Sequence, residues 1–404
     1  MYMQSFRALG VSVQVEQLLA RRGILQPFPI QELVLPDALA GHDVLAKSPT
    51  GSGKTLAFAV PIVERISRER TQPAALVLAP TRELAGQVAD EIKPLADVCG
   101  LRVVAVFGGA PIGPQAKKAR NAQILVATPG RLQDLVERKM VSLEQVNLLV
   151  LDEADRMLDM GFWPDVRRIM SLLPPKRQNM LFSATLTKDV MRVAGPTLND
   201  PASVDVAPSA TPVDAVTQAI YPVAEAQKTD LLVRLLQTEK LDRVLVFTRT
   251  KHRADRICRQ LENNRIKGAA IHSNRTQSQR QKALDGFKDG TYRVLVATDI
   301  VARGIDVDRI SHVINYDLPS QAQDYVHRIG RTARAGATGT AISFLAAEQA
   351  GEFREIEVML GETLPCSDLA GFTYMERLIP NPDRTAKKPK PRMVYNGSAR
   401  KRFR

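Results

Sequence analysis

Cysteine and aromatic residues are scarce in this 404-residue sequence. Its three cysteines, Cys99, Cys258 and Cys366, lie more than 100 residues apart. They therefore form neither a disulfide framework nor a paired metal-binding motif, which fits a reducing cytosol and predicts a cytoplasmic protein. Phe, Trp and Tyr make up only 5% of the residues, so the sequence does not indicate a ladder of aromatic platforms for single-stranded bases.

Long apolar runs are missing as well. No apolar stretch approaches the length of ~18 residues that a membrane-spanning helix needs. The N-terminus has no basic head followed by a long apolar run, so we expect no signal peptide. The five histidines are dispersed without metal-ligand spacing, which argues against a structural zinc site.

The sequence does have an ordinary globular composition and an uneven positive charge. Hydrophobic residues make up 44% and charged residues 25%, and the length favours two or three domains. The net charge is +13, but nine basic residues and no acid lie between 384 and 404, so residues 1–383 carry only +4. A basic terminal arm attracts a polyanion, most often nucleic acid. The alternative is a solubilising terminus without a specific partner.

Short apolar runs alternate with helix-like segments along the chain. The runs occupy residues 44–46, 75–79, 103–107, 124–127, 148–151, 180–182, 244–247, 269–271, 294–297, 312–315 and 341–344. Continuous apolar strands separated by helices predict an α/β fold with parallel sheets covered on both faces. Polar or glycine-containing clusters follow nearly every run. Because ligands bind at the carboxyl ends of such strands, we expect a functional site there.

The two halves of the chain resemble each other. The strand strings that end at Arg82 and Thr128 recur at Arg249 and Thr298, at offsets of 167 and 170 residues. This recurrence suggests two copies of one α/β unit. A Pro-, Ala- and Ser-rich stretch between them predicts a linker. The expected organisation is a first domain over 1–202, a linker over 203–215, a second domain over 216–370 and a basic tail over 371–404.

A phosphate-binding loop is predicted at Gly51-Ser52-Gly53-Lys54-Thr55, after one strand and before a helix. Glycines let backbone N–H groups converge on phosphates at a helix N-terminus. Lys54 would then meet the β- and γ-phosphates, and the Thr55 hydroxyl would bind Mg²⁺. Ser48 stands where the strict pattern has glycine.

An acidic pair, Asp152-Glu153, follows the strand at 148–151. In a triphosphate site Asp152 can hold the Mg²⁺ shell, and Glu153 can orient and activate the attacking water. The alternative is an acidic helix N-terminus favoured by the helix dipole.

Together with further motifs, these residues resemble the DEAD-box RNA helicases over about residues 5–365. The motifs are Pro80-Thr81-Arg82-Glu83-Leu84, Gly108-Gly109, Thr128-Pro129-Gly130-Arg131, Asp152-Glu153-Ala154-Asp155, Ser183-Ala184-Thr185, Gln277-Ser278-Gln279-Arg280, Ala297-Thr298-Asp299, Ala302-Arg303-Gly304-Ile305-Asp306 and the run from His327 to Arg334. The resemblance implies two tandem RecA-like domains, each a mostly parallel sheet with helices on both faces, and ATP in the cleft between them.

The resemblance also implies roles at the nucleotide. Arg331 and Arg334 would be arginine fingers that reach the γ-phosphate from the second domain. Gln31 would read adenine, because its amide matches the donor and acceptor of that base. Thr50 would belong to the phosphate loop, and Asp306 would contact the ribose or couple the domains. Four residues would couple the two domains: Asp155, Ser183, Thr185 and His327. Ser183 and Thr185 could equally be helix-capping hydroxyls.

Four positions near the nucleotide depart from the family pattern. Ile24 stands where Phe or Tyr usually stacks on the base, and Phe28 replaces a usual Thr. Ser48 and Pro49 replace a usual Ala and Gln before the phosphate loop. An aliphatic side chain can cover a base face but lacks aromatic stacking. We therefore expect selectivity for adenine to persist and nucleotide affinity to fall modestly.

The remaining motif residues map to family positions that contact the nucleic-acid backbone. They are Pro80, Thr81, Arg82, Gly109, Thr128, Gly130, Arg131, Arg249, Arg280 and Thr298. Arginine, threonine and glycine suit contacts to phosphate and sugar, and 2′-hydroxyl contacts would favour RNA. The sequence thus predicts a monomeric ATP-dependent RNA helicase with ATP and Mg²⁺ as cofactors. A non-unwinding RNA clamp and a DNA-directed helicase are the alternatives.

Overall fold

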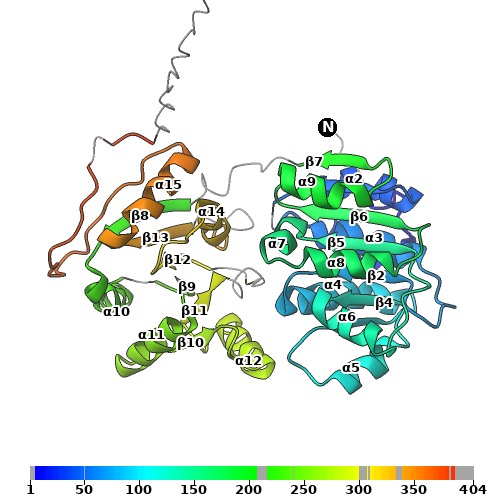
Figure 1. Cartoon of the computed structure of the whole chain (residues 1–404), viewed down its shortest axis with the longest axis horizontal. Helices are drawn as coiled ribbons and strands as arrows, with labels where there is room; N and C mark the ends of the chain where they lie inside the picture. The colour runs from blue at the N-terminus through cyan, green and yellow to red at the C-terminus, as the bar shows by residue number, and fades with distance from the viewer. Residues whose placement is uncertain are drawn as a thin grey trace, which may run out of the picture.

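The computed structural model describes residues 5–49, 51–206, 216–239, 241–299, 307, 310–333, 339–381 and 384–386. Over these ranges the chain forms two parallel sheets, of seven and six strands, and each sheet has its own covering helices (Figure 1). We call the first sheet with its helices the first unit and the second sheet with its helices the second unit. None of the helices in these ranges combines the length and the apolar character needed to cross a membrane.

The first sheet has the strand order β3-β4-β2-β5-β6-β1-β7, with every pair parallel. Its strands are β1 (Val44–Lys47), β2 (Ala75–Leu78), β3 (Val103–Val106), β4 (Ile124–Ala127), β5 (Leu148–Asp152), β6 (Gln178–Ser183) and β7 (Ala202–Asp205). In this order β6 lies between β5 and β1, so the chain segments that follow these three strands are neighbours at one edge of the sheet.

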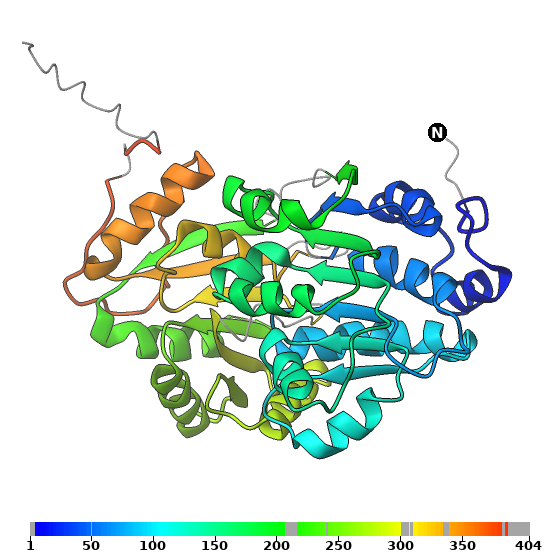
Figure 2. The same ribbon diagram turned by 45° about the vertical axis from the view of Figure 1, so that its right-hand side comes forward.

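Helices cover both faces of the first sheet because its strands are apolar on both sides. The helices are α1 (Val13–Arg21), α2 (Pro29–Ala40), α3 (Lys54–Arg65), α4 (Arg82–Val98), α5 (Ile112–Ala119), α6 (Pro129–Glu137), α7 (Ala154–Asp159), α8 (Trp163–Ser171) and α9 (Lys188–Ala194), followed by the short turn η1 (Gly195–Thr197). Helices α1 to α4 pack in one hydrophobic core, and α5 to α9 contribute to the other. Figure 2 shows α1 and α2, in blue, at the end of the unit far from the second sheet.

The second sheet has the order β10-β11-β9-β12-β13-β8, again all parallel. Its strands are β8 (Val216–Pro222), β9 (Val244–Thr248), β10 (Gly268–Ile271), β11 (Val294–Thr298), β12 (His312–Asn315) and β13 (Gly339–Leu345). The helices are α10 (Lys228–Thr238), α11 (Lys251–Asn263), α12 (Gln277–Lys288), α14 (Ala322–Ile329) and α15 (Ala350–Leu360), with short turns η2 (Glu225–Gln227) and η3 (Ala347–Gln349).

Alternate residues of one strand show how this sheet is covered. Val244 and Val246 of β9 pack in the core that includes α10 and α11, whereas Leu245 and Phe247 face the core that includes α12. Alternation of side chains across a strand explains this division. All eleven predicted strands are present, and the predicted α/β class with helices on both sheet faces is confirmed.

Two edge strands were missed by the sequence analysis. β7 lies partly inside the expected linker of 203–215, where it pairs in parallel with β1. β8 begins directly after that range and pairs with β13. Both border only one neighbouring strand, and several of their residues are exposed or only partly buried. Such strands lack the continuous apolar run that marks a central parallel strand. Residues 207–215 lie outside the described ranges.

Part of the expected tail packs against the second unit. Phe372 and Tyr374 lie against the core that contains α10 and α11, with their ring centroids 4.8 Å apart. The Arg384 guanidinium pairs with the buried Glu357 of α15 at 2.8 Å. Phe372, Tyr374 and Arg384 are therefore bound to the second unit, although the expected tail begins at 371. Aromatic packing and a buried carboxylate hold them there.

Candidate functional site

The phosphate loop forms where the sequence predicts it. Gly53, at φ 88°, precedes α3 in a left-handed conformation, which favours glycine because it has no Cβ. Lys54 is buried, and its Nζ donates a hydrogen bond to the Ser48 carbonyl at 3.1 Å. Ser52 Oγ donates to the Pro49 carbonyl at 2.8 Å and also contacts Ser48 Oγ. Ser48 and Pro49, which depart from the family pattern, thus supply contacts that organise the loop.

The other predicted loop residues lie beside these contacts. Gly51 also has a positive φ, 81°, and is exposed. Thr55 sits in the first turn of α3 and is partly buried. Thr50, which the resemblance assigns to the same loop, lies outside the described residues.

The acidic pair lies at the carboxyl end of β5. Asp152 ends that strand, and Glu153, at φ 54°, turns the chain into α7. The Glu153 carboxylate forms a buried ion pair with Arg156. Asp152 Oδ1 is buried and has no hydrogen-bond partner among the described residues. An orphaned carboxylate oxygen beside a phosphate loop fits a metal-bound water as its missing partner.

Burial controls the protonation of Asp152. It raises the pKa of this carboxyl group to about 7, with a further increase from the adjacent Glu153, while Lys54 opposes the shift. Burial and the second carboxylate thus outweigh the charge compensation that Lys54 provides. A bound cation would supply the compensation that is missing, which supports Asp152 as a position for Mg²⁺.

Asp155 joins the ends of two neighbouring strands of the first unit, β5 and β6. Its Oδ2 accepts hydrogen bonds from the Thr185 N–H and hydroxyl, both at 2.9 Å, and its N–H donates to Ser183 Oγ at 3.2 Å. Ser183 Oγ in turn donates to the Thr185 carbonyl at 2.7 Å. Burial raises the pKa of Asp155, but Lys54 and these hydrogen bonds outweigh it, so the pKa lies below its ordinary value. Asp155 is therefore held as a carboxylate, and Ser183 also caps α7.

The second unit reaches this network through α14. A pocket of about 400 Å³ is lined by Asp155 and Thr185 from the first unit and by Gln323 and His327 from the second. Burial lowers the pKa of His327, helped by Arg156 and Arg331 and opposed by Asp155. Arg331 is buried just after α14, and its Nε donates to the His327 carbonyl at 3.3 Å. Arg334 and Asp306 lie outside the described residues.

Gln31 links the N-terminal helices to the phosphate loop. Its Nε2 donates to the Gly53 carbonyl at 3.0 Å, and its Oε1 accepts from the Phe28 N–H at 3.0 Å. The side chain is fully buried. One end of the amide is therefore bound to the phosphate loop and the other to the start of α2.

Most predicted RNA-binding residues of the first unit share one pocket of about 380 Å³. Its lining includes Pro80, Thr81, Arg82, Thr128, Gly130 and Arg131. Arg82 lies against Gly109, where an added Cβ would come within 2.1 Å of the guanidinium. Arg131 Nη1 donates to the Ala110 carbonyl at 3.0 Å. The two arginines are thus positioned by the backbone around the glycine pair.

The predicted RNA-binding residues of the second unit lie at the carboxyl ends of its strands. Thr298 ends β11 and pairs with Thr248 of β9, directly before Arg249. Arg249 has half of its side chain exposed and contacts Glu352 at 3.1 Å. Arg280, on α12, lines the pocket of the first unit. The structure therefore brings Arg280 to the first-unit residues, while Arg249 and Thr298 stand together beside β9 and β11.

Comparisons with known proteins cover both units. Residues 28–193 match the DEAD/DEAH box helicase family model, and residues 227–336 match the helicase conserved C-terminal domain. The chain is 40% identical to the DEAD-box ATP-dependent RNA helicase CshA of Geobacillus kaustophilus over 88% of this chain and 76% of the relative. It is 44% identical to the ATP-dependent RNA helicase RhlB of Pseudomonas syringae pv. tomato, over 84% of this chain and 88% of that protein.

The chain belongs to the DEAD-box helicase family. A solved structure of S. cerevisiae Dbp5 bound to RNA and ADP-BeF3 resembles this helicase with a TM-score of 0.81 and 31% identity, over 90% of this chain and 95% of the other. The likeness spans both units, so the predicted tandem RecA-like architecture is confirmed.

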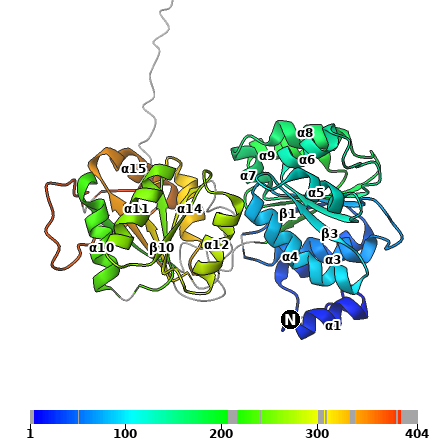
Figure 3. The same ribbon diagram turned by 90° about the horizontal axis from the view of Figure 1, so that it is seen from below.

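One contact between the units of the helicase was missed by the sequence analysis. Glu83 lies in the first turn of α4. Its Oε2 accepts from Arg280 Nη2 at 2.5 Å, and its Oε1 accepts from Gln277 Nε2 at 3.4 Å. The Glu83 and Arg280 side chains are 1% and 6% exposed. Figure 3 shows α12 on the side of the second unit that faces the first. Motif spacing could not reveal a pair between separate units.

Replacing either partner of this pair should weaken the response to RNA. Glu83→Ala and Arg280→Ala each leave a buried charge unpaired, so each should raise the RNA concentration for half-maximal ATPase by about tenfold, and the double variant should cost less than the sum. ATPase titrations with RNA measure this. Glu91→Ala is the control, because Glu91 lies on the same helix but pairs with Arg22 inside the first unit. The coupling between Glu83 and Arg280 would be contradicted if the two single effects added in the double variant. It would also be contradicted if Glu83→Ala left the RNA concentration for half-maximal ATPase unchanged.

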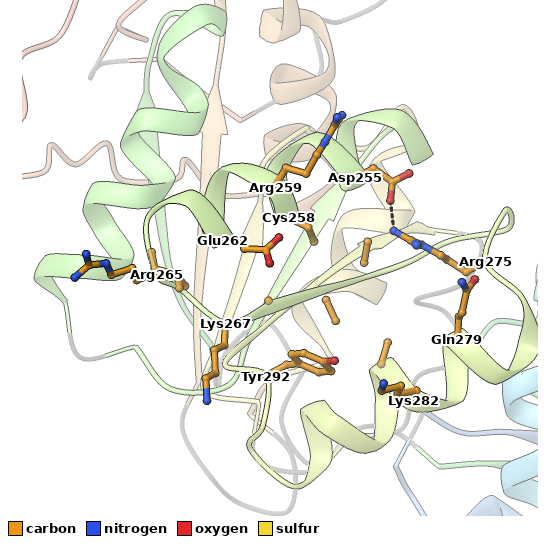
Figure 4. A pocket seen from close by; sticks show the side chains of 15 residues that line it. Asp255, Cys258, Arg259, Glu262, Arg265, Lys267, Arg275, Gln279, Lys282 and Tyr292 are labelled. Carbon is orange, nitrogen blue, oxygen red and sulfur yellow. Dashed lines mark hydrogen bonds and ion pairs between the residues drawn. The ribbon is translucent and has the colours of Figure 1, made fainter.

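A basic groove lies between α11 and α12 beside edge strand β10, and Gln279 of the Gln277–Arg280 motif contributes to its lining (Figure 4). Its volume is about 1000 Å³. Asp255 at its rim pairs with Arg275 at 2.6 Å, and burial raises the pKa of the Cys258 thiol to about 12. A thiol with so high a pKa is not a nucleophile at neutral pH. The groove therefore does not offer a second reactive centre through this cysteine.

Proposed function

We propose that this helicase hydrolyses ATP between its two units and uses the cycle to separate short RNA duplexes or remodel RNA–protein complexes. The observation that carries the proposal is the division of the site. The phosphate loop and acidic motif belong to the first unit, whereas His327 and Arg331 come from the second. Hydrolysis then depends on the two units being together, so a partner that favours their association also favours turnover.

The nucleotide is held by the first unit in this proposal. Gln31 reads adenine, and the loop of Gly51, Ser52 and Gly53 surrounds the phosphates. Lys54 gives up its hydrogen bond to the Ser48 carbonyl and pairs with the negatively charged phosphates. Thr55 and Asp152 would hold Mg²⁺, which neutralises phosphate charge when it is bound. Thr50 and Asp306 complete the set by family position. The buried, unpartnered Asp152 oxygen supports the metal position.

Hydrolysis draws on residues of both units. Glu153, fixed by its pair with Arg156, orients the water for attack on the γ-phosphate. Arg331, with Arg334 by family position, stabilises the negative charge that develops in the transition state, since planar guanidinium groups suit equatorial phosphate oxygens. The coupling between bound nucleotide and the contact of the two units is carried by four residues: Asp155, Ser183, Thr185 and His327.

RNA crosses the carboxyl edges of both sheets in this proposal. The pocket of about 380 Å³ supplies arginine, threonine and backbone groups for sugar and phosphate contacts, and Arg249 and Thr298 extend the path on the second sheet. Backbone contacts position a strand without reading its sequence. The helicase acts as a monomer in the cytoplasm, with a first domain that runs through β7 and a second domain that begins at β8. The basic residues of its C-terminus add affinity for RNA.

Strand displacement tests the proposed function. With ATP, the protein should release one strand of a short RNA duplex, and RNA should stimulate hydrolysis more than DNA of the same sequence because 2′-hydroxyl contacts are made only with RNA. Assays of displacement and phosphate release measure both effects, and ATP-free reactions serve as the control. Stimulation without displacement would identify an RNA clamp, and equal stimulation by DNA would contradict the RNA preference.

A further inference from the structure

The residue at the usual base-stacking position does not lie free for a base. Ile24 is partly buried and packs against the hydrophobic core of α1 to α4. Its N–H donates to the Leu19 carbonyl at 2.9 Å, which closes the turn after α1. The Ile24 side chain thus packs within the α1–α2 connection. Because it is aliphatic, an aromatic contact to the base would have to come from another residue.

Phe28 offers such a surface four residues later. It is 53% exposed, and it is the one aromatic side chain classed as exposed in the part of the chain that the structure describes. Phe28 precedes the first turn of α2, and its N–H donates to Gln31 Oε1 at 3.0 Å. An exposed phenyl ring leaves a large apolar area in water unless a ligand covers it.

The Phe28 ring lies beside the phosphate loop. A Cβ built on Gly53 would lie 3.0 Å from Cδ2 of this ring and 2.6 Å from Gln31 Nε2. The loop glycine, the base-reading amide and the exposed ring therefore meet at one point. The missing Cβ of Gly53 leaves room for both side chains.

We propose that Phe28 supplies the aromatic contact to adenine that Ile24 cannot provide. The inference rests on the proposed function and specifies how the same site recognises its base. Gln31 satisfies the polar edge of adenine, and Phe28 covers its apolar face. The modest loss of affinity expected from Ile24 is thereby offset within the same connection.

Nucleotide binding by the full-length protein, measured without RNA, tests the assignment. Base–aromatic stacking is sequence-tolerant and of substantial size, so Phe28→Ala should raise the Kd for ATP and for ADP by about tenfold, whereas Phe28→Trp should restore binding. The matched control is Leu25→Ala, which removes a 72% exposed side chain from the same connection. Inorganic tripolyphosphate, which has no base, is the second probe, and Phe28→Ala should leave its Kd unchanged.

The outcomes separate this inference from the function on which it rests. If wild-type protein binds ATP and Phe28→Ala binds it equally well, Phe28 has no role and the helicase function stands. An equal loss for ATP and tripolyphosphate would overturn the inference too, because the ring would then support the phosphate loop. Failure of the wild-type protein to bind ATP would overturn the proposed function itself. Melting temperatures without nucleotide confirm that each variant is folded.

Discussion

Replacing Glu153 with glutamine should abolish RNA-stimulated ATP hydrolysis and leave ATP-dependent RNA binding intact. The amide cannot accept a proton from the attacking water, and loss of a positioned general base typically lowers kcat by about 10²–10⁴-fold. Asp152, Lys54 and the phosphate loop remain, so ATP can still bring the two units together on RNA. Steady-state phosphate release measures the loss of hydrolysis. RNA binding with and without ATP measures whether ATP-dependent binding is retained.

Two further variants identify the cause of the loss. Glu153→Gln also weakens the ion pair with Arg156, so Arg156→Gln reports the contribution of that pair alone. Glu144→Gln, at an exposed acid of the same unit, controls for the change of charge. Turnover within threefold of wild type in Glu153→Gln would refute water activation by this residue. A comparable loss in Arg156→Gln would assign the effect to positioning by the arginine.

Replacing Arg331 with alanine should lower kcat by about 10³-fold while the Kd for ATP of the RNA-free protein stays within threefold. An arginine finger acts on charge that appears only in the transition state, and its removal typically costs 10³–10⁵-fold. Because Arg331 belongs to the second unit, nucleotide binding by the first unit does not need it. Single-turnover hydrolysis at saturating RNA, together with nucleotide titration, gives both quantities.

Arg328, three residues earlier at the end of α14, provides the comparison. Its guanidinium pairs with Asp299 at 2.5 Å and donates to the Asp317 carbonyl at 2.6 Å and to Asn315 Oδ1 at 3.1 Å. Arg328→Ala breaks this buried network, so we expect a lower melting temperature as well as lower activity. If Arg331→Ala instead retained wild-type kcat, or lost activity only in proportion to stability, its assignment as a finger would be wrong.

Local patterns predicted most of the fold because its central strands are apolar on both faces. The run at Val244–Thr248 is covered by helices on each side, and such a run is readable without knowledge of its neighbours. The edge strands Ala202–Asp205 and Val216–Pro222 are only partly buried, so their residues carry no such signal. Their assignment requires the partners β1 and β13.

Within the candidate site, too, some residues could be predicted from local sequence and others could not. Gly51–Thr55 and Asp152-Glu153 are contiguous motifs whose chemistry follows from spacing, and the structure places them at the ends of β1 and β5, with β6 between these two strands. The pairing of Glu83 with Arg280 joins residues 197 positions apart. It depends on how two separate sheets and their helices are placed relative to each other, which no local pattern records. The turn of Phe28 toward the phosphate loop was missed because it depends on the path of the chain after α1.

The buried pair of Glu83 and Arg280 has a consequence for how the units part. Each time they meet, both charges give up their hydration, and the loss of water largely cancels their attraction. Such a pair therefore fixes the relative orientation of the two units but adds little net free energy to their association. In the proposed cycle, RNA and nucleotide contacts can thus bring the units together and product release can separate them. A nonpolar interface of equal area would bind the two units more tightly and would slow their separation after each round of ATP hydrolysis.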